Sequence, residues 1–244
     1  MSRALFISDL HLAVERPGSN EQFFRFLHEE AARCDALYIL GDLFEYWVGD
    51  DELKDAEGDP LGRSVVRALR QLSKSGIATY LMVGNRDFLM GAKFCEASGS
   101  GFLDDPKVVE IDDRRVLLMH GDTLCTDDAD YQGWRATARS AAWQKDFLAK
   151  SLPDRRETIK GLRAKSRAMV QAKPEEIMDA NEGAVREAFR VHGVQLMIHG
   201  HTHRPAKHEH EVDGRLCQRW VLPDWYGRGG YLVLDAMGPR LVSF

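Results

Sequence analysis

The sequence predicts a mixed α/β sandwich with a helical insertion, and three observations carry this prediction. Short apolar runs alternate with helical patterns in the first part of the chain, and further strand patterns crowd its C-terminal end. Polar side chains follow five of the apolar runs, directly where each run ends. One long segment, about residues 130–175, has only helical patterning. A chain of 244 residues suits one domain of this kind, so we expect residues 1–244 to form a single domain that contains the insertion.

Each expected strand is a short apolar run bounded by polar or turn-forming residues. The five main strands cover residues 4–8, 36–40, 78–83, 116–119 and 194–198, and shorter ones cover 219–222, 230–234 and 240–244. A first helix is expected to begin at Ser19, because Gln22 stands three residues later and a helically spaced set of phenylalanines follows. A second helix is expected over residues 62–73. Alternating strands and helices, followed by strands alone, are typical of a mixed α/β sandwich.

Composition and charge narrow the class of protein. The formal net charge of −5 gives no reason to expect nucleic acid as a partner. The four cysteines are scattered without a Cys-x-x-Cys pair, which is typical of free thiols in a reducing compartment. The apolar run at residues 4–7 is too short for a signal peptide, and no run approaches the about twenty residues of a membrane span. We therefore expect a cytoplasmic protein that can still touch a membrane surface.

Five polar clusters follow the expected strands at their C-terminal ends. They are Asp9-Leu10-His11, Gly41-Asp42, Gly84-Asn85-Arg86-Asp87, His120-Gly121-Asp122 and His199-Gly200-His201-Thr202-His203. Ligands of open α/β sheets bind beyond the carboxyl ends of the strands, so the five clusters are expected to form one site. The glycines among them allow the backbone to approach that site closely.

The residue types in these clusters predict a metal site. Carboxylate, amide oxygen and imidazole together suit Mn²⁺, Fe²⁺ or Zn²⁺ without a thiolate. Asp42 stands alone after Gly41 and is expected to bridge two ions roughly 3.5–4 Å apart, which can clamp a phosphoryl group. His199 is expected to end its strand and support the site rather than bind metal. The other histidines are expected to have structural roles; these are His28, His192, His208 and His210.

The segment from 131 to 173 differs in charge from the rest of the chain. It holds eleven Lys and Arg residues against three Asp and Glu, so its formal net charge is +8 and the remainder carries −13. Apolar residues such as Trp134, Trp143 and Phe147 are interleaved with these charges. One interpretation is a solvated helical pair with an apolar core face. We favour a basic amphipathic surface that meets an anionic substrate or an anionic membrane.

The order of the five clusters resembles the motifs of the calcineurin-like metallophosphoesterase superfamily. That resemblance implies a β-sandwich flanked by helices, and hydrolysis of a phosphoester or phosphoanhydride by water. The basic helical insertion with its apolar residues is expected to serve as a lid. One metal ion would be held by Asp9, His11, Asp42 and His203, and the other by Asp42, Asn85, His120 and His201. The expected catalytic residues are Asp9, His11, Asp42, Asn85, Arg86 and His120.

Arg86 departs from the superfamily pattern, which usually has His after the Asn of the third motif. Arginine cannot usefully donate a proton to a leaving group, because its ordinary pKa is above ~12. It can still neutralise charge on a phosphoryl oxygen and bind it in bidentate fashion. A departing phosphate monoester, with a second pKa of about 6, needs little protonation at neutral pH. The residue therefore favours a pyrophosphate substrate over a simple monoester or diester.

A closer resemblance, over nearly the whole chain, is to the enzymes that hydrolyse UDP-2,3-diacylglucosamine in lipid A biosynthesis. It rests on residues 36–51, 84–89, 120–128, 176–179 and 198–205. In those enzymes water attacks the α-phosphorus, and the products are UMP and 2,3-diacylglucosamine 1-phosphate. The resemblance implies two Mn²⁺ ions per subunit and a peripheral place on the cytoplasmic face of the inner membrane. We also expect a monomer.

The same resemblance implies substrate contacts on both sides of the pyrophosphate. Asn85 and Arg86 would contact the nucleotide phosphates. Contacts to the glucosamine phosphate fall on Asp128, Ser166, Lys173 and His201. For Ser166 and Lys173 the alternative interpretation is a solvated helix position. Val170 stands where those enzymes usually have a polar contact, so that contact is either apolar or lost.

Three other functions are compatible with parts of the sequence. The first is a metallophosphoesterase acting on another nucleotide pyrophosphate or on a cyclic phosphodiester, against which Arg86 and the amphipathic segment argue. The second is a binding scaffold that has lost catalysis; such a protein is expected to lack ligands, whereas every expected ligand position is filled here. The third is a nuclease that uses the basic segment as a clamp. The charge of −13 outside that segment would repel a long duplex, so no nucleic-acid partner is expected.

Overall fold

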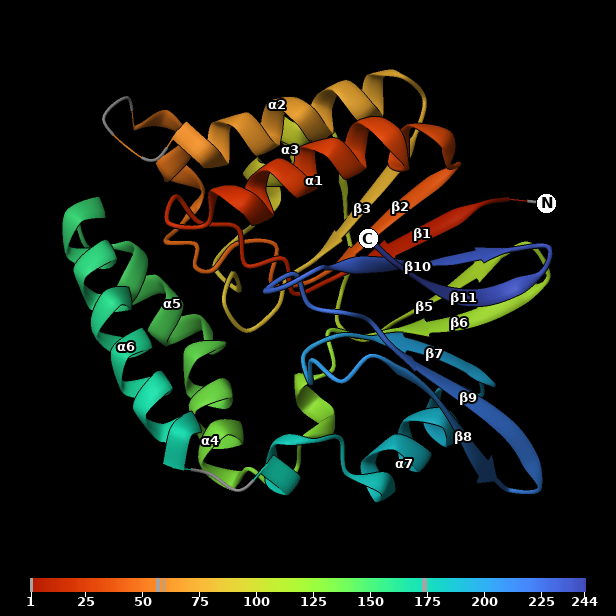
Figure 1. The fold of residues 1–244 in the computed structure, drawn as a ribbon. Helices are drawn as coiled ribbons and strands as arrows, with labels where there is room; N and C mark the ends of the chain where they lie inside the picture. Colours follow the sequence, from red (N-terminus) through yellow and green to blue (C-terminus); the bar gives the residue numbers. More distant parts are fainter. Residues whose placement is uncertain (1, 56–57, 59, 173–174) are drawn as a thin grey trace.

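Across the residues that the structure describes (2–55, 58, 60–172 and 175–244), two β-sheets pack face to face, as the computed structural model in Figure 1 shows. The first sheet has the strand order β11-β10-β1-β2-β3-β4, and the second has the order β5-β6-β7-β9-β8. The strands of the first sheet are β1 (Ala4–Ile7), β2 (Ala36–Leu40), β3 (Ala78–Met82), β4 (Gly101–Phe102), β10 (Gly230–Asp235) and β11 (Gly238–Ser243). Those of the second are β5 (Lys107–Ile111), β6 (Arg114–Leu118), β7 (Leu196–His199), β8 (Ala206–Val212) and β9 (Arg215–Val221).

Alternate residues of a central strand face different layers. In β1, Leu5 and Ile7 pack on the side of the helices, whereas Ala4 and Phe6 join the core between the two sheets. A strand that is covered on both faces needs apolar residues at every position, which is why residues 4–7 form an unbroken apolar run. β1 runs parallel to β2, and β2 to β3, so these strands end at the same edge of the sheet.

Helices cover the outer faces of both sheets. Helices α1 (Pro17–Glu29), α2 (Pro60–Lys74) and α3 (Ala92–Ser98) lie over the first sheet, and α7 (Glu182–His192) lies over the second (Figure 1). Phe23 and Phe26 of α1 are buried in the first helix–sheet core, and Val185 and Phe189 of α7 are buried in the second. Short 3₁₀ turns occur at η1 (Ala31–Arg33), η2 (Asp50–Lys54), η3 (Asp122–Leu124) and η4 (Glu175–Met178). The layers are therefore helix, sheet, sheet and helix.

Some elements differ from the expectations. Helix α1 begins at Pro17 rather than at Ser19, and the Ser19 hydroxyl donates to the Trp225 carbonyl instead of capping the helix. Proline suits a first helical position because the N–H that it lacks would be unpaired there. Strand β5 and helix α7 lie outside the predicted elements. β5 buries Ile111 alone among its residues and so lacks the pattern of a buried strand, whereas α7 does have helical spacing, with Val185 and Phe189 buried four positions apart.

The helices α4 (Ala129–Ala138), α5 (Ala141–Leu148) and α6 (Leu152–Ala172) form a separate layer beside the strand ends (Figure 1). We call these helices the insertion. Phe147 and Ile159 anchor it in the core on the helix side of the first sheet. In the part of the chain that the structure describes, no helix is both long and apolar enough to cross a bilayer.

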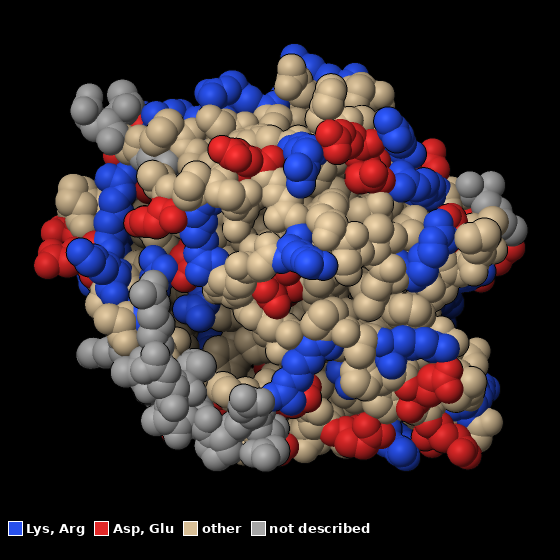
Figure 2. Space-filling view, viewed as in Figure 1, with Lys and Arg blue, Asp and Glu red and all other residues tan. Residues whose placement is uncertain are grey.

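Much of the basic charge of the insertion is used within the molecule. Several of its arginines pair with acidic residues of the loops that follow the strands. The pairs are Arg135 and Arg139 with Asp122, Arg155 with Asp51, Arg156 with Glu52 and Asp55, and Arg163 with Glu45. Over most of the face in Figure 2, Lys and Arg side chains intermix with Asp and Glu. The positive charge of this segment therefore serves partly to hold the insertion against the rest of the molecule.

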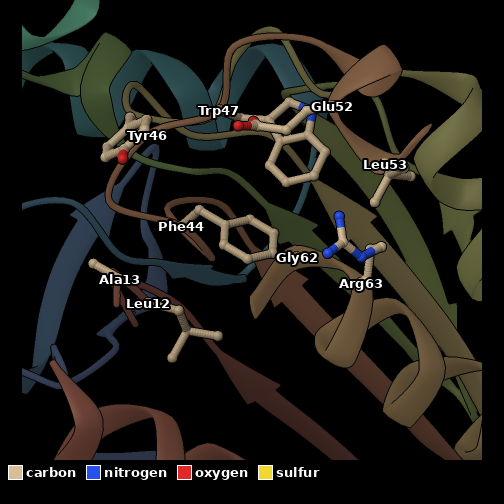
Figure 3. Close-up of a pocket in the computed structure, with 9 residues that line it drawn as sticks. All are labelled: Leu12, Ala13, Phe44, Tyr46, Trp47, Glu52, Leu53, Gly62 and Arg63. Atoms are coloured by element: carbon tan, nitrogen blue, oxygen red, sulfur yellow. The ribbon is translucent and has the colours of Figure 1, made fainter. Parts of the chain in front are cut away.

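A small cavity is lined by the loops that follow β1 and β2 and by the first turn of α2 (Figure 3). Its volume is about 20 Å³, and Leu12, Phe44, Trp47, Glu52 and Arg63 are among the residues that line it. The rings of Phe44 and Trp47 stack at its side, with 4.9 Å between their centroids. A space of this size holds about one water molecule, so it is a gap in the packing and not a substrate site.

Candidate active site

The five polar clusters meet at one edge of the two sheets, on the side of the insertion (Figure 1). Because β1, β2 and β3 are parallel to one another, and β6 is parallel to β7, their carboxyl ends point to that edge. Asp9 and His11 follow β1, Asp42 follows β2, Asn85 follows β3, His120 follows β6, and His201 and His203 follow β7. The topology thus gathers residues that are up to two hundred positions apart in the sequence.

Asp9, His11 and His203 form the first candidate cation site, and their ligand atoms all lie within 4.8 Å of one another. His203 Nε2 is 3.3 Å from Asp9 Oδ1, and His11 Nε2 is 3.9 Å from the same oxygen. His11 Nε2 is buried and has no hydrogen-bond partner in the described part of the chain. A buried imidazole nitrogen that faces a carboxylate without a hydrogen bond is well placed to bind a cation.

Asp42 lies between this group and a second one. Its Oδ2 is 3.8 Å from His11 Nε2, and its Oδ1 is 3.8 Å from His120 Nε2. The two oxygens of one carboxylate therefore face the imidazoles of different groups. This is the arrangement that a ligand shared by two cations requires.

Asn85, His120 and His201 complete the second group. Asn85 Oδ1 lies 2.9 Å from both His120 Nε2 and His201 Nδ1. His120 Nδ1 lies 2.9 Å from the Leu40 carbonyl oxygen, to which it can only donate. In the neutral imidazole this leaves the lone pair on Nε2, the atom that faces Asn85 and Asp42. The backbone thus holds His120 in the tautomer that a cation ligand needs.

The backbone is strained at these residues. Positive φ angles between 50° and 66° occur at Asp9, His11, Asp42, His201 and His203. This left-handed region costs residues other than glycine of order 1–3 kcal/mol each. Such strain persists only where the surroundings impose it, and it clusters at functional sites. Five of the expected metal ligands share this property.

Two glycines let neighbouring loops press against the candidate ligands. A Cβ atom on Gly84 would lie 2.1 Å from Asp42 Oδ1, and one on Gly200 would lie 2.2 Å from Asp9 Oδ2. No other residue fits these contacts without moving a carboxylate. The close approach explains why glycine precedes the ligand in the third and fifth clusters.

The electrostatics of the site favour a positive partner. Burial alone would lower the pKa of His120, but the carboxylates of Asp42 and Asp9 raise it to about 9. Burial would raise the pKa of Asp9, but the hydrogen bond and the charge of His203 hold it well below its usual range. His201 behaves differently, since burial and the neighbouring His120 charge lower its pKa to about 4. Buried carboxylates that stabilise a proton on one imidazole would stabilise a divalent cation in the same place.

The donor set fits two divalent cations of the borderline class. It combines carboxylate and amide oxygens with imidazole nitrogens, and the cysteines that the structure describes are buried away from it and unpaired. The structure places all the expected metal ligands in the two groups: Asp9, His11, Asp42, Asn85, His120, His201 and His203.

Glu45 supports this centre, although no pattern in the sequence singles it out. Its Oε2 lies 3.2 Å from His11 Nδ1, and it pairs with Arg163 of helix α6. Tyr226 stacks on the other side of His11, with 4.7 Å between the ring centroids. Burial would raise the pKa of Glu45, but His11 and Arg163 bring it down to about 2. A carboxylate on the outer nitrogen of a histidine ligand fixes the orientation of the ring, so Glu45 connects His11 to the insertion.

Asp87 clamps two of the loops together. Its carboxylate accepts hydrogen bonds from the N–H groups of Gly84, at 2.7 Å, and Leu43, at 2.8 Å. Burial and the charge of Asp42 raise the pKa of Asp87 to about 6. The residue belongs to the third cluster, but its role becomes visible only when the loop after β2 lies beside it.

Asp122 joins the insertion to the loop after β6. It accepts hydrogen bonds from the Tyr131 hydroxyl at 2.7 Å and from Arg135 Nε at 2.8 Å. Arg139 of the same helix, α4, donates to the Gly84 carbonyl at 2.9 Å. The first helix of the insertion is thus attached directly to two loops of the candidate metal centre.

A cavity of about 300 Å³ opens between the strand-end loops and helices α4 and α6. Its polar lining includes Asn85, Arg86, Asp128 and Ser166, and its apolar lining includes Phe88, Trp134, Ile159 and Leu162. Asp128 also caps α4, because its carboxylate accepts from the Tyr131 N–H at 3.0 Å. Lys173 lies outside the described residues, and so does the side chain of Val170. Four of the expected substrate contacts thus line one cavity, with His201 at the adjoining metal centre.

A family profile described as calcineurin-like phosphoesterase (Metallophos) matches residues 2–205. The chain belongs to this family. All five strand-end clusters lie within the matched residues. The match and the two packed sheets confirm the predictions of a calcineurin-like α/β sandwich and of a phosphoesterase that acts by hydrolysis. Enzymes of this family use a dinuclear metal site, for which the two groups supply candidate ligands.

Bacterial proteins named UDP-2,3-diacylglucosamine hydrolase are similar to this phosphoesterase over nearly its whole length. The one from Aromatoleum aromaticum is 49% identical over 236 residues, which cover 97% of this chain and 94% of the relative. The one from Chromohalobacter salexigens is 47% identical, over 98% of this chain and 96% of the relative. The one from Shigella sonnei is also 47% identical, over 98% of each chain. The predicted resemblance to this group of hydrolases is confirmed.

Proposed function

We propose that the chain hydrolyses the pyrophosphate bond of UDP-2,3-diacylglucosamine in lipid A biosynthesis, with two Mn²⁺ ions per subunit. The products would be UMP and 2,3-diacylglucosamine 1-phosphate. One observation carries the proposal: a cavity with apolar walls of Phe88, Ile159 and Leu162 adjoins a strand-end metal centre. The relatives of 47–49% identity that are named for this substrate support it. A substrate with a phosphate group beside two acyl chains needs both kinds of surface at once.

The residues of the two groups would hold the ions, with Asp42 shared between them. Divalent cations bound there supply Lewis acidity toward phosphoryl oxygens and a nucleophile at neutral pH. Asp87 is buried and does not line the cavity, whereas Glu45 is part of its wall. They keep Asp42, Gly84 and His11 in place through their hydrogen bonds and contacts. Preorganised ligands of this kind need no rearrangement during the reaction.

Arg86 is placed to bind the pyrophosphate. Its backbone N–H donates to Asp42 Oδ1 at 2.8 Å, so the residue is tied to the metal centre. Its side-chain Nε is buried and has no hydrogen-bond partner among the described residues, and the residue lines the cavity. A buried donor of this kind gains a partner when a phosphoryl oxygen enters. Water then forms a bond to the α-phosphorus and releases a proton to the solvent, and the bond from that phosphorus to the bridging oxygen breaks. The leaving phosphate monoester needs little protonation.

The insertion would act as a lid over the acyl chains and as the part that meets the membrane. Trp134 and Leu148 are 39% and 41% exposed on it, although both are large apolar side chains. We infer a peripheral position of a monomer on the cytoplasmic face of the inner membrane. Co-sedimentation with vesicles of anionic and of neutral lipids tests this, and Trp134→Ser together with Leu148→Ser is expected to reduce the bound fraction.

The reaction itself is tested with UDP-2,3-diacylglucosamine, Mn²⁺ and ¹⁸O-labelled water, with products identified by mass. Label in UMP, and none in the diacylglucosamine phosphate, is the expected result. Asp42→Ala is the matched inactive variant. Label in the lipid product would place the attack on the β-phosphorus and contradict the mechanism. Cleavage of a generic phosphodiester without cleavage of this substrate would leave the family function standing and overturn the substrate.

A further inference from the structure

Arg219 is a buried arginine in the second sheet, and its hydrogen bonds go to two histidines. The side chain of this β9 residue is 6% exposed. Its Nη1 lies 3.1 Å from His199 Nε2, and its Nε lies 3.3 Å from His210 Nε2. A buried guanidinium is usually paired with a carboxylate. The position between two imidazoles is unusual enough to need an explanation.

The chemistry of arginine decides the tautomers of both rings. A guanidinium has only N–H donors, so the nitrogen that faces it must accept. Nε2 of His199 is therefore the acceptor, and the proton sits on Nδ1, which lies 2.8 Å from the Gly200 carbonyl oxygen and donates to it. His210 has the same arrangement, with Nδ1 directed to Glu182 at 3.0 Å. His199 thus uses both ring nitrogens in hydrogen bonds, which leaves neither available to a metal.

His199 in turn touches both loops that carry ligands of the second cation group. The carbonyl that it binds belongs to Gly200, the residue before His201. The Gly200 N–H donates to the His120 carbonyl at 2.9 Å. A Cβ atom on Gly121 would lie 2.6 Å from His199 Nδ1, so the ring rests directly against the residue after His120. A rotation of this ring would displace both loops.

We propose that Arg219 is a positioning residue for the metal centre: it holds the His199 ring in one tautomer and orientation, and the ring holds His120 and His201. The residue touches neither ion nor substrate. On the other side of the guanidinium, His210 accepts from Arg219 and is itself bound to Glu182 of helix α7. The contacts therefore connect helix α7, through Arg219, with His199 in the fifth cluster. The inference rests on the two-metal centre proposed above and does not depend on the identity of the lipid substrate.

The test measures Mn²⁺ binding to the metal-free chain, by the electron paramagnetic resonance signal of free Mn²⁺. Arg219→Met is expected to raise the Mn²⁺ dissociation constant of one of the two sites by about 10–100-fold, the usual effect of removing an outer-shell partner. The dissociation constant of Arg219→Lys should lie between those of Arg219→Met and the wild type. A single ammonium group lacks the rigid, forked guanidinium that reaches both imidazole rings. The kcat should fall more than KM rises.

Two controls separate positioning from general stability. Val185→Ala removes volume from the core behind the same sheet, and it should lower thermal stability without changing Mn²⁺ affinity. Arg215→Met removes an exposed arginine from the same strand and should change neither. If Arg219→Met does not fold, the proposal is still tested by Arg219→Lys and by an NMR measurement on the wild type. Long-range ¹H–¹⁵N correlations of His199 should show the proton on Nδ1.

A His199 protonated on Nε2, or an unchanged Mn²⁺ affinity in Arg219→Met, would overturn this inference alone. A wild-type protein that binds no Mn²⁺ would overturn the proposed two-metal function together with it.

Discussion

The candidate metal centre at the strand ends and the insertion lie on either side of the same cavity, but different forces hold them. At the metal centre the backbone does most of the positioning. Five candidate ligands have positive φ angles, and glycines allow contacts that no side chain could tolerate. The insertion is attached by apolar side chains such as Phe147 and Ile159, and by charged side chains such as Arg155 and Arg163.

The two regions therefore have different roles: the strand-end loops serve the chemical step, and the insertion controls how the substrate enters. Ligands on strained, interlocked loops of two parallel strand sets keep one geometry, as a cation site requires. Helices that are held by ion pairs across a cavity can adjust their distance from the sheet when a large amphipathic substrate enters. We expect changes at the loops to abolish the reaction, and changes at the ion pairs to alter mainly substrate binding.

The largest expected contrast is between two glycines. In Gly84→Ala the new Cβ would lie 2.1 Å from Asp42 Oδ1, whereas a Cβ on Gly161 in α6 would have no atom within 4 Å. Gly84→Ala should reduce kcat/KM at least about 100-fold, the effect of losing a group that stabilises the transition state. Gly161→Ala should keep full activity and stabilise the helix by up to ~1 kcal/mol. Steady-state kinetics and thermal unfolding measure both effects, and an active Gly84→Ala would show that these loops can move to accept a side chain.

Metal removal should also distinguish the two regions. A ligand that binds only the folded state raises the free energy of unfolding by about 2.7 kcal/mol when its concentration is 100 times its dissociation constant. With Mn²⁺ the protection against hydrogen exchange should rise at residues 9–12, 41–44 and 199–203, and much less in helices α5 and α6. Exchange mass spectrometry with and without a chelator measures this. An equal rise in α6 would mean that the metal centre and the insertion behave as one unit.

Arg155→Met should affect the insertion selectively. Arg155 is 3% exposed, donates to the Val48 carbonyl at 2.7 Å and pairs with Asp51. A buried carbonyl left without its donor costs about 1–3 kcal/mol. We expect faster exchange in α6 and a higher KM, while Mn²⁺ affinity is unchanged. Lys145→Met, at an exposed position of α5, is the control and should match the wild type.

The smallest effect is expected where the two regions touch. Glu45 contacts His11 and also pairs with Arg163 of α6, and the two side chains of the pair are 6% and 19% exposed. A double-mutant cycle with Glu45→Gln and Arg163→Met should give a coupling of about 1 kcal/mol in kcat/KM, within the range for residues in contact. Additive effects would show that the insertion and the metal centre are independent.

The fold class and the candidate ligands could be predicted because their signals are local in the sequence. A buried strand is an unbroken apolar run, and a polar residue within about three positions after it lies at the edge of the sheet. Asp9, Asp42 and Asn85 all satisfy this rule, so their types and places indicated a shared site. The periodicity of the insertion was equally visible. The exact start of α1 was not, because proline and serine both signal a helix start.

The supporting residues depend on partners that are distant in the sequence. Glu45 has an ordinary place in an apolar run until Arg163 and His11 surround it, and Arg219 is one charged residue of a strand until His199 and His210 lie beside it. The positive charge of the insertion likewise suggested an external anion, but acidic residues of the strand-end loops bind much of it. The sequence alone determined which residues can bind metal, since side-chain chemistry is a local property. Only the tertiary structure decided which side chains hold those residues in place, since burial and charge pairing arise where separate segments meet.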